Sequence, residues 1–368
     1  MKKKLLALVC ALALTVSLVG CVFSTPDTVG KVGDFEVSSG LYLLAQFSAY
    51  QQAAQLAGTD QDATDVKAFL KETITTDADS GETAVVQDYV ADKTLETLRT
   101  FAAIDARFAE LGGELTAEQT QVADNYAQQL MDQYGSTYTA NGIGLETLKA
   151  FERIQLKHTL LLTLVYGPDG ESPVDDSDLT EHLDSQMYEL AYVNIPLYNT
   201  STFVSASDDQ KAQMLQLAQA AAASCSETQD GSVSEQVSAL HSAASAALPD
   251  IYAVLDSTPA EDASNVQTEL LTESDLTGAF TQDGAADAVR GLVYGEAAAV
   301  QYSSYALMML QVSTLDALRT QILSDMKGDE LEDALTAYGS TLENDLSTSA
   351  MNKMPASKIV NPSSSSNS

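Results

Sequence analysis

The sequence predicts an α+β protein, mostly helical, in which a block with strands interrupts two helical regions. Residues 95–111 show the clearest helical pattern, with apolar side chains at every third or fourth position. Residues 188–197 and 305–312 are instead short apolar runs typical of strands. Helical spacing returns over 315–346. We therefore expect one helical domain, built from both ends of the chain, with an inserted α/β domain.

The same patterns set the expected boundaries. We place the helical domain in residues 30–184 and 313–361, and the insert in residues 185–312. Residues 21–29 are a short polar tether, and residues 362–368 are serine-rich and disordered by composition.

The first helical region has recognisable local signals. A hairpin is expected around the Gly33-Asp34 turn, followed by a helix that Ser38 or Ser39 can cap. Residues 60–81 are polar and acidic, which is typical of a loop around a short helix. A long helix is expected next, over 85–111, and the two glycines after it are suited to ending it.

Two further helices complete this region. Thr116 and Gln119 fit a capping box, and Val122, Tyr126, Leu130 and Tyr134 would form the apolar face of the helix that follows. Gly135 and its neighbours predict a break in that helix. The next helix is expected over 145–166, and the aspartates at 175–178 suit the start of a short one.

The insert alternates strands and helices. After the strand at 188–197 we expect helices at about 207–224 and 233–247, then a loop marked by Pro249 and Pro259. Strands are expected over 298–301 and 305–312, with a helix near 285–293 before them. The final helical region is predicted to run from Leu315 to Leu346.

Residues 1–21 are typical of an export signal. Three lysines precede an apolar run from Leu5 to Val19, which is shorter than the roughly 18 residues of a membrane span. Leu18-Val19-Gly20-Cys21 resembles the lipobox of bacterial lipoproteins. That resemblance implies removal of residues 1–20, lipid on Cys21, and a chain anchored outside the cytoplasm to the outer face of the cytoplasmic membrane.

Composition excludes several classes of function. The net charge is −34 and becomes −37 once residues 1–20 and their three lysines are gone. Such a surface offers no basic stripe for nucleic acid. It would also not lie flat on an anionic membrane, so the lipid alone would make that contact. After processing, Cys225 would be the one remaining thiol, and no intramolecular disulfide is possible.

The order of parts resembles the SurA/PrsA type of exported foldase. That family has a helical chaperone domain, an inserted parvulin-like domain, and a C-terminal helix that returns to the first domain. The resemblance rests on six short stretches spread through the chain: Val29–Val37, Gln133–Gly135, Asp178–Leu183, Tyr294–Glu296, Tyr305–Val312 and Ala356–Asn361. It implies an extracytoplasmic chaperone whose partners are unfolded or nascent exported polypeptides. A second hypothesis is a non-catalytic lipoprotein that binds an envelope partner or ligand on the same scaffold.

The sequence departs from the parvulin pattern at the catalytic positions. Parvulin isomerases have one histidine on the first strand and one on the last, beside an apolar proline pocket. Here Asn194 takes the first position and Met308 aligns best with the second, while Ala285 and Arg290 stand where pocket aromatics are usual. We therefore expect a degenerate isomerase site, with Asn194 as its one candidate catalytic residue. The candidate client-binding cleft comprises Tyr192, Asn194, Tyr305 and Met308.

Other chemistry finds little support. His158 and His241 are expected on helix faces, and adjacent helical residues around His182 point apart, so no metal site is predicted. The motifs of zinc proteases, redox dithiols and α/β-hydrolases are absent from the sequence. No basic residue lies near Cys225 in sequence to activate it. We expect no cofactor, and the sequence does not fix the oligomeric state.

Overall fold

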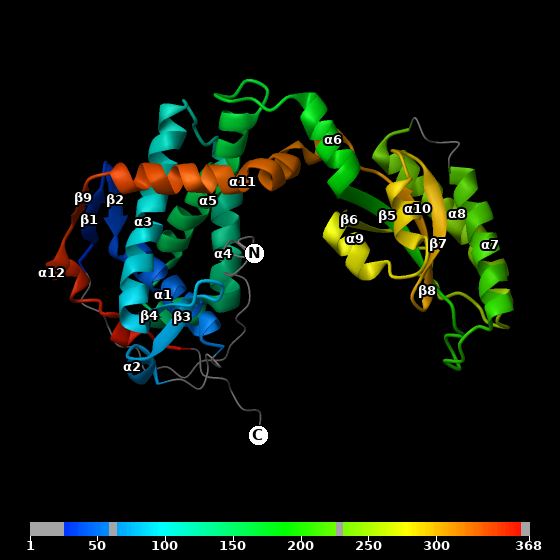
Figure 1. Ribbon diagram of the computed structural model, residues 1–368, viewed down its shortest axis with the longest axis horizontal. Helices are drawn as coiled ribbons and strands as arrows, with labels where there is room; N and C mark the ends of the chain where they lie inside the picture. Colours follow the sequence, from blue (N-terminus) through cyan, green and yellow to red (C-terminus); the bar gives the residue numbers. More distant parts are fainter. Residues whose placement is uncertain (1–25, 59–64, 226–230, 362–368) are drawn as a thin grey trace. The chain divides into compact units, whose positions relative to one another are not determined.

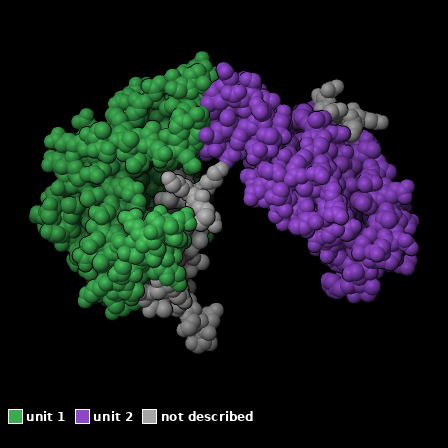
Figure 2. All heavy atoms as spheres, viewed as in Figure 1, with its two compact units in different colours: residues 1–173, 327–368 green, residues 174–326 purple. Residues whose placement is uncertain are grey.

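The computed structural model describes residues 26–58, 65–225 and 231–361, so the predicted signal, Cys21, the start of the tether and the serine-rich tail lie outside the described residues (Figure 1). The fold is mixed α+β, mostly helical, with small antiparallel sheets. It divides into two compact units, coloured in Figure 2. We call residues 1–173 with 327–368 the helical unit, and residues 174–326 the sheet unit.

The helical unit is built around long helices. Its main helices are α1 (Ser39–Leu56), α3 (Val86–Glu110), α4 (Ala117–Ala140), α5 (Leu145–Tyr166) and the second half of α11 (Leu315–Thr341). Its shorter helices are α2 (Val66–Phe69), α12 (Thr348–Met351) and the 3₁₀ turn η2 (Ala356–Lys358). Its strands are β1 (Thr28–Val32), β2 (Phe35–Ser38), β3 (Thr73–Asp77), β4 (Glu82–Val85) and β9 (Asn344–Leu346).

Local capping forms as the sequence predicts. The Ser38 side chain accepts a hydrogen bond from the backbone N–H of Leu41 at 3.1 Å. Thr116 and Gln119 form the reciprocal capping box of α4, at 3.1 and 2.9 Å. Each bond satisfies an N–H that has no partner within the first turn of its helix.

The C-terminal segment packs on the start of the chain. Strand β9 pairs antiparallel with β1, which also pairs with β2. Farther on, the Gln46 side chain donates to the carbonyl of Met354 at 3.2 Å. Asn141 donates to the carbonyl of Val360 and accepts from its N–H, both at 2.9 Å. Residues 344–361 thus complete a unit begun more than 200 residues earlier.

The sheet unit contains one four-stranded antiparallel sheet in the order β6-β5-β8-β7. Its strands are β5 (Met187–Pro196), β6 (Gln267–Thr272), β7 (Ala297–Tyr302) and β8 (Tyr305–Gln311). Its helices are α6 (Asp176–Gln186), α7 (Asp208–Cys225), α8 (Val233–Ala253), α9 (Glu273–Ala279) and α10 (Ala285–Arg290), with the first half of α11.

The two faces of this sheet are covered differently. Alternate residues of β5, such as Val193 and Ile195, form a core with α7 and α8. The other alternate residues, such as Tyr188 and Leu190, form a second core with the short helices α9 and α10. The strand period of two thus gives one face fully packed under long helices and one face only partly covered.

Several local predictions are wrong. The short helix expected within residues 60–81 is α2, but the residues after it form the hairpin β3–β4 where a loop was expected. Helix α4 continues through Gly135, since the buried Tyr134 and Tyr138 anchor both sides of the predicted break. On the same helix Val122 and Tyr126 are exposed, and the buried stripe instead begins at Ala123 and Ala127.

Other differences lie in the insert and after it. Helix α8 continues past Pro249 to Ala253, because Pro249 is on the exposed side, where the carbonyl it leaves unbonded can meet water. Strand β6 was not predicted because it is an edge strand with one buried side chain, Leu271, and so lacks alternation. Helix α11 ends at Thr341, and β9 occupies residues 344–346, where the helix was expected to continue.

Candidate functional site

Asn194 lies in the middle of the partly covered face of the sheet. Its register partner on β8 is Leu307, and strand alternation places it on the same face as Tyr192. Its side chain is half-buried, and within the described part of the chain it has no hydrogen-bond partner. An amide at this position can donate and accept hydrogen bonds, but it does not titrate.

Met308 does not belong to this face, contrary to the predicted cleft. It pairs with Val193, has 0% of its surface exposed, and packs in the core under α7 and α8. Successive residues of a strand point to opposite faces, so Met308 lies on the side of α7 and α8, while Leu307 and Met309 lie on the side of Asn194. On this face of β8, Leu307 lies opposite Asn194, and Tyr305 and Met309 are its two diagonal neighbours, so the one polar side chain that β8 offers beside it is Tyr305.

Tyr305, the remaining predicted residue, is part of a series of aromatic rings. It is the register partner of Tyr302 across the Ser303-Ser304 turn, so both rings lie on the Asn194 face. Tyr302 contacts Phe280 at 5.0 Å between ring centroids. On the other side, the Tyr305 and Tyr198 rings lie 5.9 Å apart with their hydroxyl oxygens at 3.1 Å. These four rings and Phe203 are the aromatic row.

Phe203 ends the aromatic row in an ordered loop. Its ring stacks on Tyr198 at 6.3 Å, yet 79% of the residue is exposed, and the neighbouring Val204 is 64% exposed. Asn199 holds the loop: its side-chain oxygen accepts from Ser201 and Thr202 N–H, and its amide donates to the Leu255 carbonyl. Phe203 has a φ of 58°, a region that costs a bulky residue energy. The loop therefore presents an apolar ring to solvent in a strained conformation.

Tyr192 connects the face to the sheet edge. Its hydroxyl donates to the carboxylate of Glu269 on β6 at 3.1 Å. Burial, the Glu269 charge and the nearby Tyr302 hydroxyl all raise the pKa of Tyr192, so its phenol stays protonated at neutral pH. Tyr192, Tyr302 and Tyr305 are all half-buried, and these hydroxyl-bearing rings share the face with Asn194.

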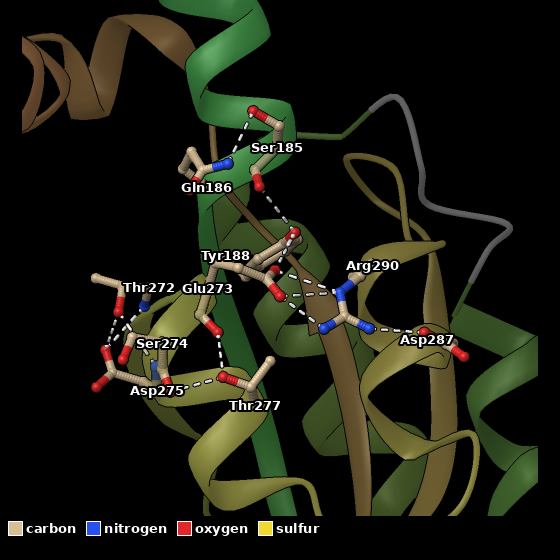
Figure 3. A network of polar contacts seen from close by, with 10 residues as sticks. All are labelled: Ser185, Gln186, Tyr188, Thr272, Glu273, Ser274, Asp275, Thr277, Asp287 and Arg290. Atoms are coloured by element: carbon tan, nitrogen blue, oxygen red, sulfur yellow. Dashed lines mark hydrogen bonds and ion pairs between the residues drawn. The ribbon is translucent and has the colours of Figure 1, made fainter.

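The other end of this face is fixed by the ion-pair network drawn in Figure 3. Arg290 on α10 contacts Glu273 on α9 at 2.6 Å and Asp287 at 2.6 Å. The Tyr188 hydroxyl donates to Glu273 at 3.2 Å. Hydrogen bonds from Arg290 hold the pKa of Glu273 below its usual range. Arg290, noted in the sequence for replacing a pocket aromatic, thus ties the two short helices to the sheet.

None of the three histidines is on β5 or β8, the strands that carry the predicted site. His158 is next to Glu332 in the helical unit at 3.0 Å, and His182 on α6 bonds to Asp325 at 2.8 Å. His241 is on α8, which covers the opposite face of the sheet, and its ring contacts the Ser264 carbonyl. Within the sheet unit, the rings of His182 and His241 thus have partners on α11 and in the loop after α8, and neither partner belongs to the aromatic face.

Other chemical sites also find no support in the described residues. Those residues contain no cluster of metal-ligating side chains. Burial raises the pKa of the Cys225 thiol, which lies in the core. The described helices include none that is both long and apolar enough to cross a bilayer.

Sequence reasoning missed four members of the aromatic row: Tyr198, Phe203, Phe280 and Tyr302. Tyr302 could have been found, because two strands joined by a two-residue turn place residues 302 and 305 opposite each other. The exposure of Phe203 has no signal in the sequence, since an apolar residue in a loop is as often buried as exposed.

The comparisons with known proteins identify no family. No protein-family model matches the sequence, and no curated protein matches it. The structure is similar to that of the foldase protein PrsA from Lactococcus lactis, with a TM-score of 0.33 and 11% sequence identity. The similarity covers 91% of this chain and 100% of that one. This degree of similarity says nothing of what the present chain binds.

Proposed function

We propose that this chain is a lipid-anchored, extracytoplasmic chaperone that binds unfolded exported polypeptides on the aromatic face of its sheet unit. We further propose that this unit is a parvulin-like domain whose isomerase site is degenerate. Cys21 would carry the lipid, and the binding face would comprise Tyr192, Asn194 and the aromatic row.

The observation that carries this proposal is the incomplete cover of one sheet face. Tyr192, Tyr302 and Tyr305 are half-buried on a floor made of Leu307 and Met309, which are 5% and 0% exposed. Tyrosine offers a large apolar area together with a hydroxyl, so it can pack on varied side chains and bond to a peptide backbone. Such a surface can therefore bind extended segments that contain apolar residues, whatever their exact sequence.

Catalysis of prolyl isomerisation is expected to be absent or very weak. Rotation about the X–Pro bond has a barrier of about 18–20 kcal/mol, and lowering it needs placed polar groups beside a seat for the ring. Asn194 is the one side-chain amide at the centre of the face, and its neighbours from β8 are Leu307, Met309 and the phenol of Tyr305. A single amide can make some of the hydrogen bonds that two imidazoles would make. It cannot gain or lose a proton as an imidazole does.

The test is suppression of aggregation of a reduced, unfolded client by the mature chain. We expect suppression by the parent protein and its loss when Tyr192 and Tyr302 are both changed to serine. Tyr126→Ser, a change at an exposed tyrosine of the helical unit, is the matched control and should retain suppression. Circular dichroism checks that each variant is folded. Full suppression by the folded double variant would exclude this face as the binding surface.

Isomerisation is measured separately, by NMR exchange on proline tetrapeptides that differ in the residue before proline. We expect that the parent protein does not accelerate cis–trans exchange of the proline bond in any of these peptides. Rapid turnover that is lost in Asn194→Ala would show instead that the chain is an enzyme.

The alternative, a non-catalytic lipoprotein with a folded envelope partner, is distinguished by the same aggregation assay. Under this alternative, the parent protein does not suppress aggregation, whether or not Tyr192 and Tyr302 are changed.

The anchor is tested by mass spectrometry of the mature protein, which should lack residues 1–20 and carry an acylated Cys21. An unchanged membrane fraction for Cys21→Ser would contradict the anchor.

A further inference from the structure

We infer that the aromatic face selects polypeptide segments in which lysine or arginine stands beside apolar residues. This inference rests on the proposed function and specifies its substrate class. Two features carry it: the apolar anchor at Phe203 and Val204, and the carboxylates around the aromatic row that lack a cation of their own.

The charge of the sheet unit is strongly one-sided. Residues 174–326 contain 23 aspartates and glutamates against three lysines and arginines. All three cations are engaged in ion pairs within the unit: Lys211 with Asp208 at 3.3 Å, Arg290 with Glu273 at 2.6 Å, and Arg319 with Asp176 at 2.7 Å. No lysine or arginine of the sheet unit is therefore left to pair with its remaining carboxylates.

Some of these carboxylates lie at the rim of the aromatic face. Glu269 is exposed on the edge strand and contacts the Tyr192 hydroxyl at 3.1 Å. Asp256 is exposed at the other end, directly after Leu255, whose carbonyl accepts from Asn199 in the Phe203 loop. Asp209 is exposed at the start of α7, a few residues after Val204. Negative charge thus lies at the β6 edge of the aromatic face, at Glu269, and beside the residue that anchors the Phe203 loop, at Asp256.

The loop supplies the apolar part of the same surface. Phe203 and Val204 are the two most exposed large apolar residues among the described ones, and they are adjacent. Phe203 keeps its position through its stack on Tyr198 and the bonds of Asn199, so little ordering is needed when a client binds. A client segment with an apolar residue on Phe203 would bind beside Asp256, which follows the residue that Asn199 of the loop bonds.

The experiment uses three fluorescent peptides with one shared apolar centre, flanked by lysine, serine or glutamate. Fluorescence anisotropy with the mature chain measures their dissociation constants at low and high salt. We expect the lysine peptide to bind about tenfold more tightly than the glutamate peptide at low salt, since several exposed charge pairs contribute a few-fold each. This preference should nearly vanish at about 1 M salt, where the screening length is about 3 Å.

Variants show which part of the binding comes from the carboxylates at the rim and which from the apolar anchor at Phe203. Glu269→Gln combined with Asp256→Asn should reduce the preference to about threefold, while Asp92→Asn, a change at an exposed acid of α3 in the helical unit, should leave it unchanged. Phe203→Ser should weaken all three peptides by a similar factor, because it removes the shared apolar contact. A double variant that keeps the full preference would overturn the role of the rim.

The outcomes separate this inference from the function on which it rests. Equal binding of all three peptides would refute the charge preference and leave client binding standing. Absence of binding by any peptide would refute client binding at this face, and the inference with it. Sedimentation of the chain alone is the last measurement: a dimer that is lost in Phe203→Ser would mean that a second copy of the chain covers this surface.

Discussion

Both units bury aromatic residues, but the sheet unit also leaves a set of aromatic rings at the surface of its sheet. In the helical unit Tyr50 and Phe69 are fully buried and meet edge to face at 5.5 Å, and Phe101 packs on Phe151 at 5.8 Å. In the sheet unit Tyr302 and Tyr305 are half-buried, and Phe203 is 79% exposed. Rings inside a core stabilise the fold, whereas rings left at the surface of an ordered sheet are available to another chain. We therefore expect substitution of the buried rings to lower the stability of the fold, and substitution of the surface rings to weaken client binding.

The largest effect is expected from removing the C-terminal segment. A chain that ends at Thr314 loses Leu331 and Leu335, which are 4% and 2% exposed, and the pairing of β9 with β1. Each buried leucine stabilises by about 1.5–3 kcal/mol, and the whole domain by only about 5–15 kcal/mol. We expect the helical unit to unfold at a much lower temperature. An unchanged melting temperature would show that this segment does not belong to the helical unit.

A matched pair of substitutions tests the comparison itself. Phe69→Ala should lower the free energy of unfolding by about 3–5 kcal/mol, because it leaves a cavity beside Tyr50. Phe203→Ala should change it by no more than about 0.5 kcal/mol, because the ring is mostly in water. Urea denaturation measures both. A large loss of stability in Phe203→Ala would mean that the exposed ring serves the fold.

A smaller effect on stability is expected from the carboxyl groups, whose pKa values are shifted in opposite directions at one position of each unit. Burial raises the pKa of Glu152 on α5 to about 7, whereas Arg290 lowers the pKa of Glu273. A raised folded-state pKa means that the contribution of Glu152 to stability is complete below its unfolded value of 4.5 and is lost as the pH rises through 7.

Glu152→Gln should therefore stabilise the chain at pH 8 by about 1–2 kcal/mol, allowing for partial exposure of the side chain, and should have little effect at pH 4. Urea denaturation at the two pH values is the measurement. Equal effects at pH 4 and pH 8 would show that Glu152 titrates as it does in water.

The sequence predicted the features that depend on near neighbours. The extents of α3 and α5, the capping box of α4 and the strands β5 and β8 follow from local spacing and capping. The missed strands β6 and β9 are held by pairing with distant strands, so their own residues carry little signal. Met308 was misplaced for a related reason, since the register of β8 on β5 is set by the whole sheet.

The candidate site was predicted in part. Tyr192, Asn194 and Tyr305 do share a face, which follows from the register of β5 and β8. The exposure of Phe203 depends on the bonds of Asn199 and on the φ of Phe203 itself, which no pattern in the sequence specifies. The surface for a client is thus harder to predict than the strands that support it.

Site-specific photo-crosslinking tests the central claim most directly. A photoreactive phenylalanine analogue is placed at Phe203, at Tyr302 and, as a control, at Tyr126 of the helical unit, and the mature chain is illuminated with an unfolded client. The account predicts strong crosslinks from positions 203 and 302, and weak ones from position 126. Crosslinks from position 126 alone would contradict it, because the client would then bind the helical unit and not the aromatic face.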